Sequence, residues 1–102
     1  MIKETTILQG LDDEQTYESV DAFFTAHGLD EWRAKELKCF TDAGFDVTDS
    51  TKQMAEMSDD GKRVIITVAY TDQAEKDAIF ANADAGEGPA GLTQYITEDH
   101  LF

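Results

Sequence analysis

Apolar and polar positions along the chain predict a strand followed by a long helix at the N-terminal end. Residues 2–8 carry isoleucine, threonine and leucine in a strand-like pattern that Gly10 ends. Asp12 and Gln15 have the spacing of a capping box, in which side chains bond the free N–H groups at a helix start. Apolar residues then recur at helical spacing up to Gly28. The pattern predicts a first helix from Asp12 to Gly28.

A second helix is predicted directly after the first. Asp30 is placed as its N-terminal cap and Gly44 as its C-terminal stop, because glycine readily adopts the positive φ that ends many helices. Trp32, Leu37 and Phe40 fall on the side expected to face inward. The two helices should therefore form a hairpin with a very short connection.

The middle of the chain predicts a β-hairpin. Residues 45–57 and 62–71 favour strands, and Asp60-Gly61 between them is turn chemistry, since glycine accepts the positive φ that tight turns require. The second strand is apolar on both faces around residues 64–68, which is typical of a central strand. The apolar phase of the first strand shifts along its length, which indicates a bulge or a sheet edge.

A third helix is predicted over residues 73–84. Asp72 and Glu75 form a second capping box at its start. Its expected apolar side consists of Ala74, Ala78, Ala81 and the neighbouring Ile79 and Phe80.

The remaining segment completes the expected fold. Residues 86–91 predict a loop, residues 92–97 a last strand, and residues 100–102 a free tail. The resulting order, β-α(α)-β-β-α-β, is a ferredoxin-like pattern of the α+β class, with one antiparallel sheet and the helices packed on one face. We expect a single domain over residues 1–102, and the opposite sheet face should meet solvent or a second copy in a homodimer.

Charge changes the picture more than any motif does. The chain has 22 acidic and 8 basic residues, a formal net charge of −14, and the excess is spread over its whole length. Such a surface repels nucleic acid and anionic membranes and attracts basic partners.

Cysteine content and hydropathy bear on the compartment. Cys39 is the only cysteine, so an intrachain disulfide cannot form. Neither a signal-like apolar run at the N-terminus nor a membrane-length apolar stretch occurs in the sequence. We expect a cytoplasmic protein.

Motifs with specific chemistry are weak. Residues 86–91 match G-x-G-x-x-G literally, but the nucleotide-binding version follows a strand and opens a helix, which is the reverse of the order expected here. The acids at 46–49 and 59–60 lack the ligand spacing of a calcium loop, and His27 and His100 lack that of a metal site. We therefore predict no catalytic residue, metal site or cofactor, and no enzymatic activity.

An acidic stripe is the best candidate binding feature. Asp13, Glu14, Glu18 and Asp21 would share the outer half of the first predicted helix. Residues three and four apart on a helix lie about 5–6 Å from one another, a spacing comparable to that of phosphates along a DNA strand. A plain solvated face explains the same residues.

Three functions remain open. The favoured one is a small acidic, non-enzymatic interaction protein, such as a phage or mobile-element inhibitor that imitates nucleic acid and occupies the basic, nucleic-acid-binding groove of a protein partner. The third, adaptation of the whole surface to high salt, fits poorly because six of the eight bases are lysine.

The second function rests on a resemblance. The run from Gly61 through Phe80 resembles the hairpin and helix of small dimeric α+β barrel proteins. The resemblance implies a small protein that binds or transforms an apolar ligand, with Tyr17, Trp32 and Tyr70 as candidate pocket residues. Core packing is the favoured explanation of these three residues, because large aromatic side chains usually dominate cores.

Overall fold

The structure is a computed structural model that describes residues 1–12, 14–82, 92–96 and 100–101. Within this part of the chain it contains the helices α1 (Val20–Ala26), α2 (Asp30–Asp42) and α3 (Gln73–Asn82), and the strands β1 (Ile2–Gly10), β2 (Gln53–Met57), β3 (Arg63–Tyr70), β4 (Leu92–Ile96) and β5 (His100–Leu101). These elements confirm the α+β class. No helix among the described residues is long and apolar enough to cross a membrane.

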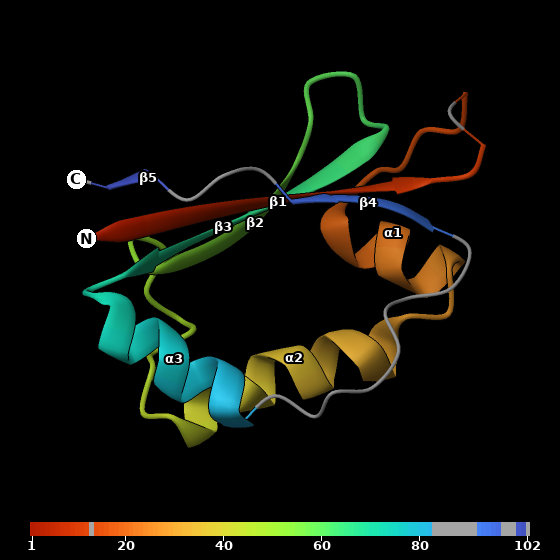
Figure 1. Cartoon of the computed structure of the whole chain (residues 1–102). Coiled ribbons are helices and arrows are strands. Elements are labelled where there is room, and N and C mark those ends of the chain that lie inside the picture. Colours follow the sequence, from red (N-terminus) through yellow and green to blue (C-terminus); the bar gives the residue numbers. More distant parts are fainter. Residues whose placement is uncertain (13, 83–91, 97–99, 102) are drawn as a thin grey trace.

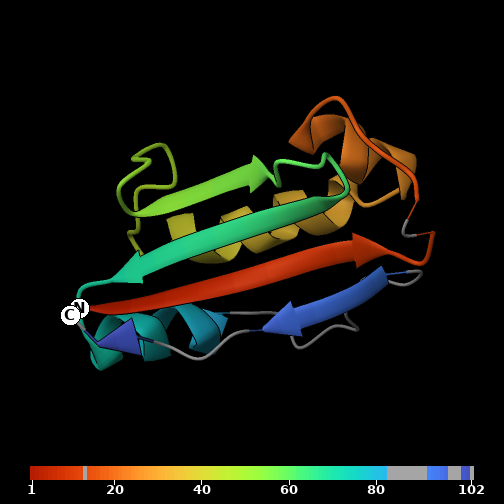
Figure 2. The same cartoon turned by 90° about the horizontal axis from the view of Figure 1, so that it is seen from above.

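The strands form one sheet, and all three helices lie on one of its faces (Figure 1). The order across the sheet is β2-β3-β1-β4, with antiparallel neighbours (Figure 2). β5 pairs with the first residues of β1, on the same edge as β4. Because the described helices all lie on one face, the sheet has an inner and an outer side (Figure 1).

The core lies between the sheet and the helices. β3 alternates in burial along its length, and its inward residues are Val64, Ile66, Val68 and Tyr70. Because β3 pairs on both edges, its prediction as a central strand is confirmed. The other buried apolar side chains are Ile2, Leu8, Phe23, Phe24, Leu29, Phe40, Phe45 and Ile79.

Glycine ends the first two helices as predicted. Gly44 has φ +82°, and the N–H of Phe45 bonds the carbonyl of Phe40, which ties the chain back onto the last turn of α2. The rings of Phe40 and Phe45 lie 5.2 Å apart at this junction. Gly28 ends α1 in the same way, with φ +65°, so the short helical hairpin is confirmed.

The start of α1 differs from the prediction. The helix begins at Val20, and its N-terminal cap is Ser19, whose hydroxyl accepts the N–H of Ala22 at 3.0 Å. The expected capping box is absent: the Asp12 carboxylate accepts the N–H of Glu14 instead, a local turn. Residues 14–18 form a loop rather than the first part of the helix.

β2 is shorter than predicted. Residues 45–52 do not belong to the strand, because two aspartates close local turns there. Asp46 accepts the N–H and hydroxyl of Thr48, and Asp49 does the same for Thr51. Side-chain bonds of this type compete with strand pairing.

α3 faces the sheet differently from the prediction. Its capping box is confirmed, since the Asp72 carboxylate accepts the N–H of Glu75 at 2.9 Å. Ile79 is buried as expected, but Phe80 is 51% exposed, and the alanines Ala74, Ala78 and Ala81 are exposed too. Lys76, not an alanine, takes an inward position, with only 14% of its side chain exposed.

The C-terminal segment is only partly described. The last predicted strand is present as β4, and the loop over residues 86–91 lies outside the described residues. The tail was expected to be free, but His100 and Leu101 pair with Lys3 and Ile2 as β5. That expectation is wrong for these two residues.

Candidate functional site

The acidic residues predicted to bind a partner do not share a helix. Glu14 and Glu18 lie exposed in the loop before α1, and Asp21 is exposed in its first turn. Asp13 lies outside the described residues. Because α1 begins only at Val20, the helical spacing that suggested a phosphate-like ladder is not formed.

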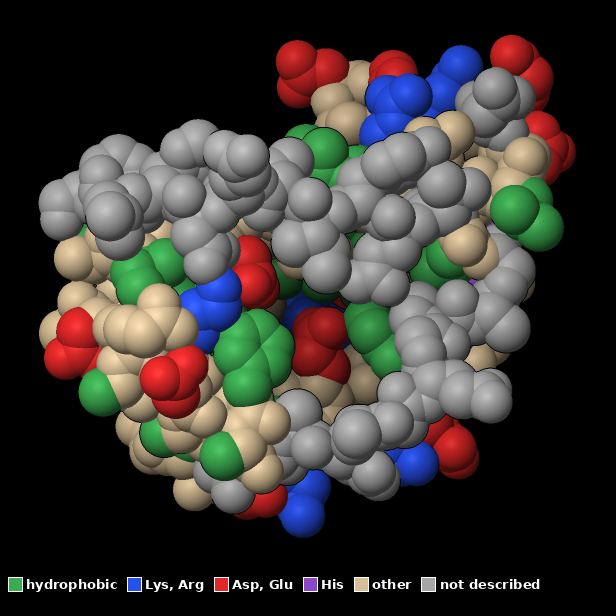
Figure 3. All heavy atoms as spheres, viewed as in Figure 1, with side chains coloured by type: hydrophobic (Ala, Val, Ile, Leu, Met, Phe, Trp, Pro, Cys, Tyr) green, Lys and Arg blue, Asp and Glu red, His purple; other side chains and the backbone are tan. Residues whose placement is uncertain are grey.

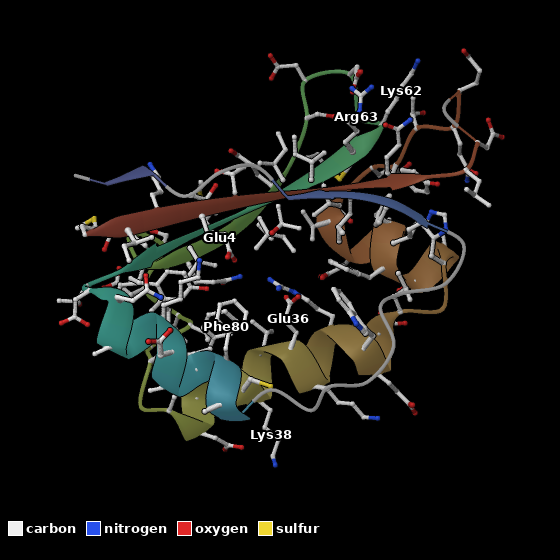
Figure 4. The ribbon with its side chains drawn as sticks, in the orientation of Figure 1. Glu4, Glu36, Lys38, Lys62, Arg63 and Phe80 are labelled. Carbon is white, nitrogen blue, oxygen red and sulfur yellow. The ribbon has the colours of Figure 1, made fainter. Side chains whose placement is uncertain are left out.

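The loop before α1 is nevertheless held in place. The N–H of Tyr17 bonds the carbonyl of Gly61 at 2.8 Å, which docks the loop on the turn between β2 and β3. Lys62, at that turn, lies 3.9 Å from the Glu14 carboxylate. Loop and turn together place exposed acids and bases at one end of the molecule (Figures 3 and 4).

A different group of charges lies inside the molecule, between the sheet and the helices. Glu4 projects from the inner face of β1, where its register partner Val68 is part of the core. The Lys76 ammonium lies 3.3 Å from the Glu4 carboxylate, which is also 3.4 Å from the Tyr70 hydroxyl that donates to it. Only 16% of the Glu4 side chain is exposed.

A second ion pair faces this one from α2. Arg33 and Glu36, one turn apart, form a hydrogen-bonded salt bridge. Their side chains are 15% and 26% exposed. Figure 4 shows Glu4 below the sheet and Glu36 above α2, so that both lie in the layer between them.

The charge state of Glu36 reflects this environment. Burial raises the pKa of its carboxyl, because the charged form loses solvation. Arg33 lowers the pKa in part, and the nearby Glu4 carboxylate raises it again. Glu36 therefore accepts a proton more readily than an exposed glutamate does.

A depression on the molecular surface, which we call the hollow, lies beside these charges (Figure 3). Figure 3 shows a depression in the face between the sheet and α2, with acidic and basic side chains at its floor. Aromatic rings accompany the bases: Arg33 lies 5.6 Å from the centre of the Phe24 ring, and Lys76 lies 5.7 Å from that of Tyr70. Phe80, over which Lys76 also lies, stands at the α3 side of this layer (Figure 4). We call Glu4, Arg33, Glu36 and Lys76 the interior charge cluster.

One more polar group belongs to the inner face. Gln53 of β2 and Glu4 of β1 both pair with Val68, from its two sides. Gln53 is 6% exposed, and its Nε2 has no hydrogen-bond partner among the described residues. A buried donor of this kind costs free energy until it meets an acceptor.

The aromatic residues proposed from the sequence as pocket or core separate into different groups. Tyr17 donates or accepts a hydrogen bond with His27 at 2.8 Å and packs on Phe23, at the α1 end of the core. Tyr70 instead packs on Phe45 and Phe80. Burial, aided by the negative charge of Asp12, raises the pKa of the Tyr17 hydroxyl.

Comparisons with known proteins give no relative. No family model matches the chain, and no curated protein and no solved structure is significantly similar to it. Within the described residues, no three His, Cys, Asp or Glu side chains are arranged to hold a metal ion. Function has to be inferred from the site itself.

The interior charge cluster was not predicted from the sequence. Its members come from three elements that are far apart in the chain, so no local motif joins them. One signal was present: Glu4 shares the inward side of β1 with Ile2 and Leu8, where an apolar residue is the norm.

Proposed function

We propose that the protein binds a small molecule in the hollow between the sheet and α2. The observation that carries this proposal is the interior charge cluster, four ionisable side chains that are each no more than 26% exposed, at the floor of a surface depression. A buried carboxyl with a raised pKa in a concave site, such as Glu36, is a typical mark of a functional site.

Stability alone explains the cluster poorly. Taking charges out of water costs several kcal/mol per ion, and apolar replacements of buried pairs are often neutral or stabilising. A chain of 102 residues has a small core in which to offset that cost. Binding of a ligand to the interior charge cluster would explain why these charged side chains are kept in the interior.

The cluster also defines the kind of ligand. Charged groups at the floor and aromatic rings beside them suit a molecule with an apolar body and one polar end, rather than the wholly apolar ligand implied by the α+β barrel resemblance. The strand order β2-β3-β1-β4 supports a ferredoxin-like arrangement, which we propose as the topology that creates this space.

The test is a fragment screen by nuclear magnetic resonance on the full chain. A library of small acids, amines and neutral molecules should contain binders that shift the amide signals of Glu4, Arg33, Glu36 and Lys76. Exposed Lys38, on the same helix as Arg33, should not respond. A library with no member that shifts the cluster signals at millimolar concentration would contradict the proposal.

A second candidate function is supported by the surface. Glu14, Glu18 and Asp21 are all exposed, and a net charge of −14 attracts basic proteins. On this proposal the protein is a cytoplasmic inhibitor that covers the nucleic-acid-binding groove of a basic partner. The loop before α1 would then supply part of the contact.

Neutralising variants test this second candidate. Glu14→Gln, Glu18→Gln and Asp21→Asn together should weaken the binding of a captured basic protein, and the wild type should block that protein's binding to DNA. The matched control neutralises Glu31, Glu56 and Asp77, which are also exposed. If both triple variants weaken binding equally, the partner responds to the overall negative charge and not to the loop before α1. If neither weakens binding, this second candidate function is wrong.

A further inference from the structure

We infer that the hollow binds a small carboxylate, whose oxygens form an ion pair with Arg33. Glu36 then loses its own ion pair with Arg33 and takes up a proton from solvent. This inference rests on the proposed small-molecule function and specifies its ligand. It follows from the balance of donors and acceptors around the interior charge cluster, from its charge, and from the rings beside it.

Among the described residues of this layer, Arg33 and Gln53 have N–H groups for which no acceptor is present. A guanidinium carries five N–H groups, and the acceptor of Arg33 among the described residues is the Glu36 carboxylate, bonded through a single nitrogen, Nη1. The buried Nε2 of Gln53, on the same inner face, has no acceptor within the described part of the chain. A ligand that brings carboxylate oxygens would supply what the layer lacks, and Arg33 can hold it through two parallel N–H bonds.

The charge of the cluster points the same way. With both glutamates ionised, Glu4 and Glu36 balance Arg33 and Lys76. An additional anion would leave this group with an excess negative charge that is costly inside a protein. The balance is kept if Glu36 is protonated as the ligand carboxylate enters.

Glu36 is suited to that exchange. Its burial and the Glu4 carboxylate on β1 both raise its pKa, whereas Arg33 on its own helix holds it down. Lys76 on α3 is paired with Glu4 rather than with Glu36. When a ligand engages Arg33, the group that opposes protonation is withdrawn, and the remaining two influences favour the neutral acid.

The apolar part of the ligand has rings to pack against. Phe80 stands beside the cluster and is 51% exposed, although it belongs to a helix whose Ile79 is buried. A ligand body that covers Phe80 would remove apolar surface from water, a favourable term of about 25 cal/mol per Å². Carboxylates with an aryl or short alkyl body are therefore the expected class.

Matched acids and amides test the class directly. Acetate, benzoate and phenylacetate are compared with acetamide, benzamide and phenylacetamide, which have nearly the same shape without the charge, by titration of the full chain at pH 6. We expect the aryl acids to bind about tenfold more tightly than their amides, as for a charge-assisted bond in a partly dry site. Their affinity should rise as the pH is lowered from 8 to 6, with net proton uptake measured by calorimetry in two buffers of different ionisation enthalpy.

Variants separate the exchange from general electrostatics. Glu36→Gln imitates the protonated acid, so it should bind benzoate at least about tenfold more tightly than the wild type at pH 8 and lose the pH dependence. Glu56→Gln removes the same charge from an exposed position on β2 and should change the affinity less than about twofold. Arg33→Gln in the Glu36→Gln background, which leaves no unpaired carboxylate, should abolish the preference for acids over amides.

The outcomes are distinguishable. Fragments that shift the cluster signals but include no acid preference, or amines that bind better than acids, would overturn the carboxylate and keep the small-molecule function. Benzoate binding that weakens in Glu36→Gln, or that takes up no proton, would overturn the exchange. A screen without any binder at the cluster would overturn the function itself.

Discussion

Two lysine–glutamate pairs in this protein show how differently the same chemistry acts at its surface and in its interior. Lys62 lies 3.9 Å from Glu14, whose side chain is 85% exposed. Lys76 lies 3.3 Å from Glu4, and both of these side chains are at most 16% exposed. The first pair is in water, where it contributes about 0–1 kcal/mol at most. The second has lost most of its water, so each partner depends on the other.

Acids in the two regions also differ in their pKa values. Asp46, Asp49 and Asp60 are exposed, and hydrogen bonds from hydroxyl and N–H groups of their own turns lower their pKa. Glu36, in the interior, has a raised pKa because burial outweighs its ion pair with Arg33. The surface excess of acid therefore costs little locally, whereas each interior charge requires a specific partner.

The strongest test places an acid in the interior without a partner. Ile66→Asp on β3 puts a carboxylate at a position that is 5% exposed and surrounded by core residues. We expect a loss of about 3–5 kcal/mol or more, enough to unfold a small domain. Circular dichroism should show no cooperative melting. A variant that melts within a few degrees of the wild type would show that interior acids need no base here.

The next test breaks each lysine–glutamate pair. Lys76→Met should lower the free energy of unfolding by about 2–3 kcal/mol, somewhat under the cost for a fully buried pair, because Glu4 is left without its base. Lys62→Met should change it by less than about 0.5 kcal/mol. Urea unfolding measures both. Glu4→Gln combined with Lys76→Met should recover most of the loss, and equal effects of the two single variants would refute the distinction.

A smaller effect is expected at the loop that carries the surface acids. Ser19→Ala removes the cap of α1 and should cost about 1 kcal/mol. Asp12→Ala, at the start that the sequence predicts, should leave the helix content of α1 unchanged. Helix signals and thermal melting of the two variants decide between the two starts. A larger loss of helix signal in Asp12→Ala than in Ser19→Ala would show that α1 begins near Asp12, as the sequence predicts. The acidic residues before Val20 would then lie on a helix.

The smallest effects are in the pH dependence of stability. The folded pKa of Glu36 lies above its usual value of 4.5, so its contribution is fully present below that value and is lost as the pH rises through the folded pKa. Relative to the wild type, Glu36→Gln should therefore gain stability as the pH is raised from 4.5 through the folded pKa of Glu36, which urea unfolding at a series of pH values measures.

Asp49 should show the opposite slope. Its folded pKa lies below its usual 3.8, so its contribution is present above that value and lost as the pH falls through the folded pKa. Asp49→Asn should thus be less stable than the wild type at neutral pH, and the difference should disappear in acid. If the stability of both variants, relative to the wild type, changed with pH in the same direction, surface and interior acids would not differ in this way.

Local signals in the sequence predict much of this fold. The Asp60-Gly61 turn, the glycine stops at Gly28 and Gly44 and the cap of α3 each depend on a few neighbouring residues. The start of α1 is not determined by neighbouring residues alone, because Asp12 and Ser19 are both good N-terminal caps. The observed start coincides with the bond from Tyr17 to Gly61, which is 44 residues away by the numbering.

The candidate site was harder to predict for the same reason. Glu4 and Lys76 meet only because β1 lies beside β3 and α3 packs beneath them. Their sequence positions give no spacing to recognise. A single glutamate on the inward side of an otherwise apolar strand was the available signal, and it says that a partner exists without saying which residue it is.

The position of β1 within the sheet also has a consequence for synthesis. β1 is the earliest strand of this sequence, yet its register partners in β3 follow 54 to 68 residues later, from Gln9 with Arg63 to Ile2 with Tyr70, and those in β4 later still. At about 5–20 residues per second, a ribosome needs several seconds to produce β3 after β1 has been translated. Throughout that interval both edges of β1 lack their native partners. The growing chain therefore carries a strand with unpaired backbone groups, and chaperones or the acidic charge of the chain must keep it from pairing with other chains.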